Sequence, residues 1–280
     1  MITNIEVFYT DCGRANEMTS KIVGGAVVNA HKYPWMVTVH ADNGLCGGAL
    51  ITRQYVLTAA HCVTNKRNIG VGIAVHDRNR PGQIIPASVV KIHPEYRETE
   101  HYDIALIKLQ GAVIISERVR TLCLPHNLNL EQAGKHAIAA GWGMTQPGNP
   151  NSDSKFLKEV NLKILNAERI ITAQGVNLTG ACMATGSLFL EVVSDSHVNR
   201  EGRGGLMGDS GSPLFTRYAD GKYHVIGVTA TTLKRPRPCM GVSNYARVSV
   251  HTQWIMNNIM DSVPCEMAND EMAPVATNHL

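Results

Sequence analysis

Gly208-Asp209-Ser210-Gly211-Ser212-Pro213 is one of three short segments that belong together, although the other two lie far upstream. These are Thr58-Ala59-Ala60-His61-Cys62 and Tyr102-Asp103-Ile104-Ala105-Leu106. Each segment holds one member of a Ser/His/Asp triad. A serine hydroxyl is a weak nucleophile at neutral pH, so it needs a base to take its proton and a carboxylate to orient that base. The sequence therefore predicts Ser210 as nucleophile, His61 as base and Asp103 as the orienting group.

The histidine and the aspartate each have a simpler interpretation. The chain has twelve histidines, and for the other eleven an ordinary surface or core imidazole is the expectation. Asp103 could be a turn residue at the start of a strand. The residues after it, Ile104-Ala105-Leu106-Ile107, are apolar enough to form a buried strand, where an unpaired carboxylate would be costly. A hydrogen bond to His61 would remove that cost, which favours the catalytic interpretation.

Further motifs follow one another in a fixed order along the chain. They are Ile22-Val23-Gly24-Gly25, Tyr33-Pro34-Trp35, Cys46-Gly47-Gly48, Gly141-Trp142-Gly143, Tyr245-Ala246-Arg247-Val248 and a helix with Trp254. With the triad order His, Asp, Ser, they make the chain resemble the chymotrypsin/trypsin family of serine endopeptidases from about Ile22 to Met260.

This resemblance implies an all-β fold of two packed six-stranded Greek-key barrels with a C-terminal helix, and an active site in the cleft between the barrels. His61 and Asp103 would come from the first barrel and Ser210 from the second. The domain organisation that follows is an activation segment at 1–21, a protease domain at 22–263 and a tail at 264–280. The resemblance calls for no cofactor.

The resemblance also implies roles for residues around the nucleophile. Backbone N–H groups of Gly208 and Ser210 would form the oxyanion hole. Lys21 would be the activating cleavage site, and the freed ammonium of Ile22 would pair with Asp209 and order the oxyanion loop. The precursor would then be a zymogen whose partners are an activating trypsin-like protease, protein or peptide substrates and protein inhibitors.

The substrate pocket departs from the family pattern. Gly204 stands where trypsin-like enzymes carry the aspartate that binds Arg or Lys, and Thr232 and Ser243 would narrow the pocket where glycines usually line it. An uncharged pocket cannot pair a buried guanidinium, so we expect small or medium apolar P1 residues, those before the scissile bond.

Three other positions near the nucleophile also differ from the family pattern. Leu206 replaces a half-cystine, Ser212 replaces a glycine, and Ala230-Thr231-Thr232 replaces the usual Ser-Trp-Gly wall of the substrate groove. An alternative function therefore stays open, that of a catalytically impaired homologue acting as a binding protein.

The chain has seven cysteines, whose pairing indicates the cellular compartment in which the protein folds. Family resemblance pairs Cys46 with Cys62, which would fix the loop of the catalytic histidine. It pairs Cys12 with Cys123, which would tether the activation segment after cleavage. Such disulfides imply an oxidising compartment, so we expect a secreted protein. Residues 1–11 lack a basic start and a solid apolar core, so they do not form a convincing signal peptide.

The amino-acid composition limits which other classes of protein are compatible with the chain. With 280 residues of which 44% are hydrophobic, the chain can bury a sizeable core as one large unit or two packed barrels. The formal charge of +3 does not argue for nucleic acid or a membrane surface as partner. No apolar run approaches the ~18 residues that a membrane-spanning helix needs. No His-Glu-x-x-His or paired Cys-x-x-Cys spacing predicts a metal site.

Short β-rich stretches broken by Gly, Pro and Asn clusters predict a sandwich or barrel. Those expected are 34–40, 55–59, 87–93, 103–109, 158–165 and 224–228. One helix is expected after Ser249 as N-cap, with Val250, Trp254, Ile255 and Ile259 on one face.

Overall fold

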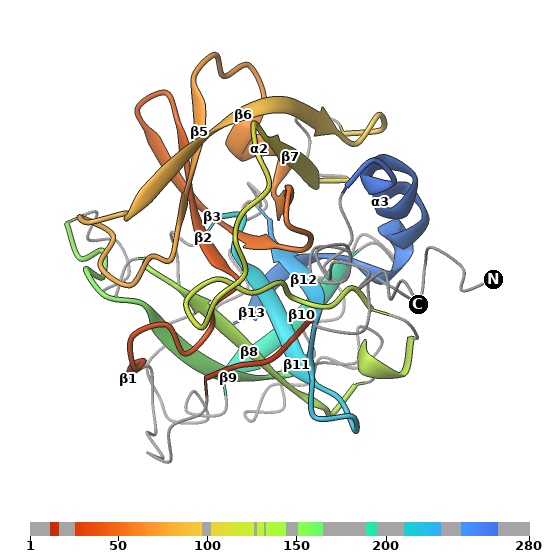
Figure 1. The fold of residues 1–280 in the computed structure, drawn as a ribbon. Coiled ribbons are helices and arrows are strands. Elements are labelled where there is room, and N and C mark those ends of the chain that lie inside the picture. The colour runs from red at the N-terminus through yellow and green to blue at the C-terminus, as the bar shows by residue number, and fades with distance from the viewer. Residues whose placement is uncertain are drawn as a thin grey trace, which may run out of the picture.

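Two β-structures built from successive parts of the chain form the molecule (Figure 1). The structure is a computed structural model and describes residues 12–16, 26–96, 102–125, 128–131, 133–143, 151–164, 189–194, 210–230 and 242–262. Within these ranges, no helix has both the length and the apolar character needed to cross a membrane.

A closed six-stranded barrel comes first, with the strand order β2-β3-β4-β7-β6-β5 and antiparallel pairing throughout. Its strands are β2 (Met36–Ala41), β3 (Gly44–Leu50), β4 (Tyr55–Thr58), β5 (Ile69–Ile73), β6 (Gln83–Ile92) and β7 (Ala105–Leu109). Buried Val, Ile and Leu side chains fill its interior. The short helix α2 (Ala60–Val63) follows β4 directly.

The second sheet has seven strands in the order β1-β9-β10-β13-β12-β11-β8. They are β1 (Ala26–Val27), β8 (His136–Gly141), β9 (Lys158–Ile164), β10 (Phe189–Ser194), β11 (Pro213–Arg217), β12 (Tyr223–Thr229) and β13 (Val242–Arg247). Because β8 also pairs with β9, six of these strands form a closed ring and β1 is added at β9. The predicted all-β, two-barrel fold is confirmed.

An aromatic cluster joins the two halves. Tyr33 and Trp35, just before β2, pack against Phe215 of β11 with ring centroids 4.9 and 5.4 Å apart, both in edge-to-face geometry. Tyr223 of β12 completes the group, 5.7 Å from Phe215. All four side chains are buried, so the Tyr33-Pro34-Trp35 motif contributes apolar contacts between the barrels.

Two helical segments end the described chain, the 3₁₀ helix Ser249–His251 and the α-helix α3 (Thr252–Ile259). α3 lies against the closed barrel (Figure 1). Asp261, just after it, accepts hydrogen bonds from Lys108 and from the Tyr55 hydroxyl, each at 2.6 Å. These two donors lower the pKa of Asp261 to about 2. The end of the second half is thus tied to strands of the first.

The prediction that Ser249 caps this helix is wrong. Ser249 lies inside the 3₁₀ turn, and its hydroxyl donates to Glu131 Oε2 at 2.7 Å. Glu131 also accepts a hydrogen bond from Arg247 at 3.0 Å. The serine hydroxyl that the sequence pattern assigns to the helix cap therefore binds a buried carboxylate instead. Ile255 and Ile259 are buried as predicted, whereas Val250 is 43% exposed.

All six stretches predicted as strands contain one, with ends shifted by a few residues. The largest shift is in β6, which begins at Gln83 rather than Ala87. Pro86 lacks an N–H donor, but its carbonyl still accepts the Gln110 N–H at 3.0 Å, so the strand continues through it.

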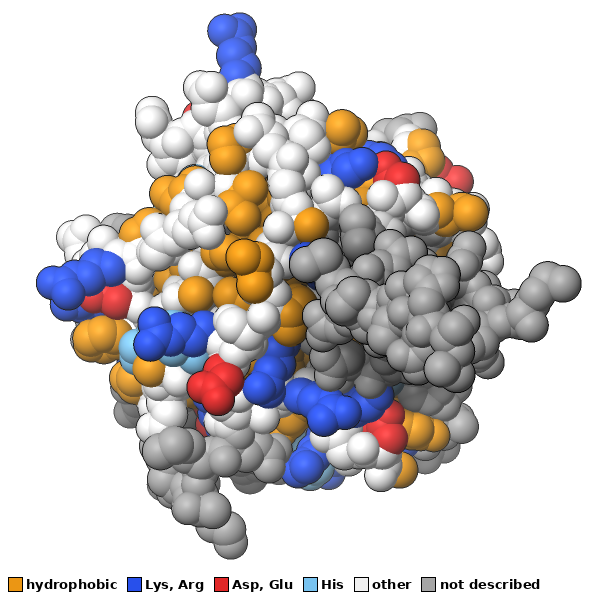
Figure 2. All heavy atoms as spheres, in the orientation of Figure 1, with side chains coloured by type: hydrophobic (Ala, Val, Ile, Leu, Met, Phe, Trp, Pro, Cys, Tyr) orange, Lys and Arg blue, Asp and Glu red, His pale blue; other side chains and the backbone are white. Residues whose placement is uncertain are grey.

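The outer face of the closed barrel is partly apolar. Figure 2 shows hydrophobic side chains gathered over it. Ile84 and Val89 of β6 are 49% and 45% exposed, and they line a surface hollow of about 600 Å³ together with Lys66 and Arg67. Single exposed apolar side chains are common on soluble proteins, so this face by itself assigns no function.

Candidate active site

His61 lies in α2, at the end of the closed barrel where β4 leaves the sheet. Its ring Nδ1 lies 2.7 Å from Asp103 Oδ2, and its backbone N–H donates to Asp103 Oδ1 at 2.9 Å. Because Nδ1 faces a carboxylate, the neutral imidazole carries its proton on Nδ1 and leaves Nε2 as the acceptor. The His61 side chain is 23% exposed, which leaves the ring accessible from solvent.

Asp103 lies two residues before Ala105, where β7 begins. Its side chain is 2% exposed, so it needs hydrogen bonds to remain charged at low cost. His61 supplies two, one from the ring and one from the backbone. The carboxylate is thereby fixed relative to both the ring and the helix that carries it. The sequence motif predicts the ring contact but gives no sign of the backbone one.

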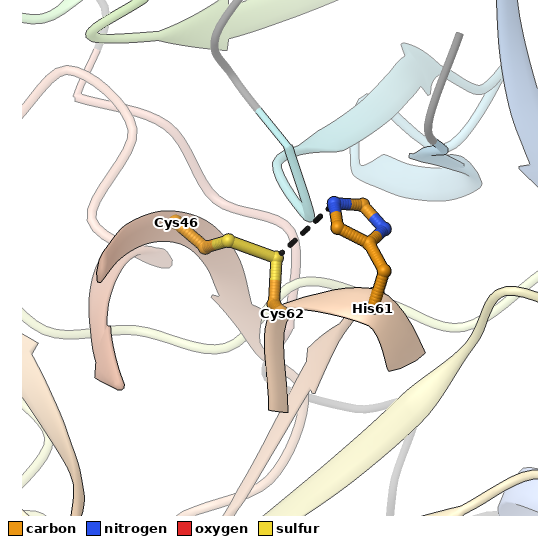
Figure 3. Close-up of side chains that lie close together, drawn as sticks. All are labelled: Cys46, His61 and Cys62. Atoms are coloured by element: carbon orange, nitrogen blue, oxygen red, sulfur yellow. Dashed lines mark hydrogen bonds between the residues drawn. A yellow bond between two sulfur atoms is a disulfide. The ribbon is translucent and has the colours of Figure 1, made fainter. Parts of the chain in front are cut away.

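A disulfide between Cys46 of β3 and Cys62 of α2 ties the helix to the barrel (Figure 3). Cys62 Sγ lies 3.6 Å from His61 Nε2. The three side chains have ligand atoms within 4.8 Å of one another, a spacing that a metal ion could use. The two sulfurs are bonded to each other, however, so neither is a thiolate and this group does not form a metal site.

Ser210 reaches the same place from the second half of the molecule. Its carbonyl accepts the Gly47 N–H at 2.8 Å, next to Cys46. Gly211 adopts φ +79°, and a Cβ there would collide with the Thr58 side chain and the Gly47 carbonyl. Only glycine fits this close approach between the two barrels. The segments that carry His61, Asp103 and Ser210 therefore meet where the barrels join.

Ser212 shows how tightly this contact is packed. It is buried, and a Cβ added at Gly47 would collide with its side chain. Its hydroxyl has no hydrogen-bond partner within the described part of the chain. On the other side, β12 holds the strand in place: the Gly211 N–H donates to Thr229 O and the Thr229 N–H donates to Ser212 O, each at 2.9 Å. The cysteine-glycine-glycine motif is the sequence signal for the approach at Gly47.

The other predicted site residues fall largely outside the described ranges. Among them are Lys21 and Ile22 of the activation site, Gly208 and Asp209 of the oxyanion loop, and Gly204 and Thr232 of the pocket. Ser243 lies in β13, paired with Val192 of β10.

The other predicted disulfide, Cys12–Cys123, is present in the structure. It holds residues 12–16 against the protein body. Beside it, the Gly13 N–H donates to the Thr121 carbonyl, and the Tyr223 N–H donates to the Gly13 carbonyl, both at 2.8 Å. This short segment is therefore anchored by backbone hydrogen bonds as well as by the covalent link.

Comparison with known proteins agrees with this architecture. A sequence model of the trypsin family matches residues 22–255. Ovochymase-2 of Mus musculus is 36% identical over 221 residues, which are 75% of this chain and 35% of that protein. The proclotting enzyme of Tachypleus tridentatus is 30% identical over 275 residues, 89% of this chain and 69% of that protein. The clotting factor G beta subunit of the same organism is 28% identical over 263 residues, 87% of this chain and 81% of that protein.

The family model spans most of the chain, and the fold fits it. The chain belongs to the trypsin family, whose members are serine endopeptidases. It spans about a third of the length of ovochymase-2.

Proposed function

We propose that this chain hydrolyses peptide bonds through an acyl-enzyme, with Ser210 as nucleophile, His61 as base and Asp103 as the group that orients the base. The observation that supports this most strongly is the pair of contacts from one buried carboxylate to the ring and the backbone of His61, at 2.7 and 2.9 Å. An ion pair formed by chance would not require the carboxylate to contact both the ring and the backbone of His61. The contact of Ser210 with Gly47 supports the third assignment.

In the proposed reaction, Ser210 Oγ attacks the carbonyl carbon of the scissile bond while its proton passes to His61 Nε2. Asp103 stabilises the imidazolium that forms. The negative charge on the tetrahedral oxygen would be met by the N–H groups of Gly208 and Ser210. As the intermediate collapses, the imidazolium returns its proton to the leaving amine. A water molecule, deprotonated by His61, then releases the acyl group from Ser210.

The direct test is covalent labelling. After cleavage at Lys21, a fluorophosphonate should label the protein with about one equivalent at Ser210, because only an activated hydroxyl reacts with it. Ser210→Ala should take up none. Ser212→Ala is the matched control and should label normally, since it removes a neighbouring hydroxyl. Equal labelling of Ser210→Ala and the unmodified sequence would rule out Ser210, and absence of labelling in the cleaved protein would favour the binding-protein alternative.

The proposal includes synthesis as a zymogen in an oxidising compartment. Cleavage after Lys21 would free Ile22 to pair with Asp209, and the protease domain at 22–263 would then become active. Cys12–Cys123 supports this, because the linkage would keep residues 1–21 attached after the cut. Two disulfides in the described part of the chain support secretion. An activating trypsin-like protease and protein inhibitors are the further partners proposed.

We expect the activated enzyme to prefer small or aliphatic P1 residues. With glycine at 204, a Lys or Arg side chain would lose its hydration without gaining a charged partner, whereas Ala, Val or Leu loses little on entry. In a peptide library varied at P1, kcat/KM for Ala, Val or Leu should exceed that for Arg by about tenfold or more.

Gly204→Asp is the matched variant for this pocket, because it supplies the missing carboxylate and should shift the preference toward Arg and Lys. A clear preference for Arg in the unsubstituted enzyme would contradict the assignment of Gly204 to the floor of the pocket.

A further inference from the structure

Tyr102, the residue before Asp103, has an unusual backbone conformation. Its φ is +58°, in the left-handed region that a residue with a bulky side chain rarely adopts. The Ile104 N–H donates to the Tyr102 carbonyl at 2.7 Å and so closes a tight turn with Asp103 at its centre. The direction of the Asp103 carboxylate therefore depends on a backbone conformation that is unfavourable for a tyrosine unless other contacts stabilise it.

Rings from two distant segments hold Tyr102 in that conformation. The Tyr102 ring stacks on His93, just after β6, with centroids 4.8 Å apart and an angle of 18° between the planes. His251 meets the Tyr102 ring edge-on at 5.7 Å and the His93 ring at 5.0 Å. Trp254 of α3 packs against His93, also at 5.0 Å. We call Tyr102, His93, His251 and Trp254 the ring cluster.

Polar contacts orient the same rings. The Glu95 N–H donates to His93 Nδ1 at 3.2 Å, and the Glu95 carboxylate near the Tyr102 hydroxyl raises the pKa of that hydroxyl. Burial lowers the pKa of His93. Burial, and to a smaller extent the nearby His93, lowers the pKa of His251 to about 4. Both imidazoles are therefore neutral at pH 7 and pack without mutual charge repulsion.

We propose that Tyr102 is a positioning residue for catalysis: its ring contacts hold the left-handed backbone that directs the Asp103 carboxylate onto His61. This inference rests on the proposed triad and adds to it a residue whose ring contacts, among the described residues, are with His93 and His251 and not with His61. When the ring is lost, the backbone at 102 can relax toward its ordinary right-handed form. The carboxylate then moves away from the two nitrogens of His61 that it contacts at 2.7 and 2.9 Å.

The consequence for the reaction is specific to the chemical step. A shift of about 1 Å in a catalytic group can cost about 10²-fold in rate. Asp103 acts on the imidazolium that forms in the transition state, so a shift in its position should lower kcat and leave KM nearly unchanged.

Three substitutions at position 102 separate the contribution of the ring from that of the backbone. Tyr102→Phe keeps the stacked ring and loses only the exposed contact to Glu95, so kcat should stay within about twofold of the parent. Tyr102→Ala loses the ring and still disfavours positive φ, so kcat should fall by at least about tenfold. Tyr102→Gly loses the ring but tolerates positive φ, so its kcat should lie between those two. KM should be nearly the same for all three.

Phe156→Ala is the matched control, because Phe156 also stacks on a histidine, His76, with centroids 5.2 Å apart, and neither residue belongs to the ring cluster. Its kcat should match that of the parent. Proton NMR supplies a readout that needs no turnover: the downfield signal of the His61 Nδ1 proton, which marks its hydrogen bond to Asp103, should persist in Tyr102→Phe and weaken in Tyr102→Ala.

The results of these experiments distinguish a failure of the proposed triad from a failure of the role proposed for Tyr102. An inactive parent protein that does not label would contradict the triad assignment. An active parent whose Tyr102→Ala variant keeps both its kcat and the downfield signal would overturn the role of Tyr102 alone. A fall in kcat that the Phe156→Ala control shares would likewise overturn it, by pointing to a general loss of stability.

Discussion

Asp103→Asn should lower kcat by about 10⁴-fold while leaving KM within a few-fold of the parent. Asparagine has nearly the same shape, but its amide can donate as well as accept hydrogen bonds. It therefore favours the imidazole tautomer with its proton on Nε2, where the Ser210 proton has to go. It also removes the charge that stabilises the imidazolium. Steady-state kinetics on a peptide ester or amide substrate measure the effect.

The control for this variant is its fold. Asp103 Oδ1 accepts a backbone N–H from His61, and the asparagine oxygen can do the same, so α2 should stay in place. Thermal unfolding should therefore change far less than activity does. Full activity in Asp103→Asn would remove Asp103 from the triad. A loss of activity that matches a loss of folded protein would leave Asp103 with a structural role only.

Lys21→Gln should hold the protein in an inactive form when it is treated with trypsin, because it removes the basic side chain that such an activator recognises. In the proposed zymogen mechanism, the uncleaved protein has no free Ile22 ammonium to pair with Asp209, so the oxyanion loop would lack the ion pair proposed to order it. Loss of a single oxyanion donor costs about 10²–10³ in kcat, so cleavage of the unsubstituted protein should raise activity by at least that factor.

Electrophoresis and peptidase assays on the same samples measure this prediction. Under reducing conditions the cleaved protein should lose a short N-terminal fragment, and without reductant Cys12–Cys123 should retain it. Lys21→Arg is the matched control, since a trypsin-like activator should cut it normally. High activity in the uncleaved Lys21→Gln protein would contradict the zymogen mechanism.

The sequence motifs predict much of the fold because this family's chemistry and packing require particular residue types in a particular order. Strands with clear alternation or apolar runs, such as β4 and β7, were predicted closely. β3 and β5 were not predicted, since Gly44–Leu50 and Ile69–Ile73 contain glycines that lower strand propensity. Those glycines are needed where other parts of the protein press close: a Cβ at Gly47 would meet Ser212, and one at Gly48 would meet Val56.

The helix after β13 shows the opposite case, in which a local rule pointed to the wrong role. Ser249 before an apolar run is typical of an N-cap. In the structure it donates to Glu131, a residue far away in the sequence. A hydrogen bond to a buried carboxylate contributes more than the cap of one helix turn, so the tertiary contact determines where the hydroxyl points.

For this protein the sequence by itself determined the family and pointed to the three proposed catalytic residues, because both follow from residue type and order along the chain. The two disulfide pairs followed from the resemblance to that family. Only the tertiary structure decided how Asp103 contacts both the ring and the backbone of His61, how Gly47 receives Ser210, and how the ring cluster holds Tyr102. These features depend on hydrogen bonds, ring contacts and close approaches between residues far apart in the chain. Their geometry is set by the packing of the two barrels, which no local pattern records.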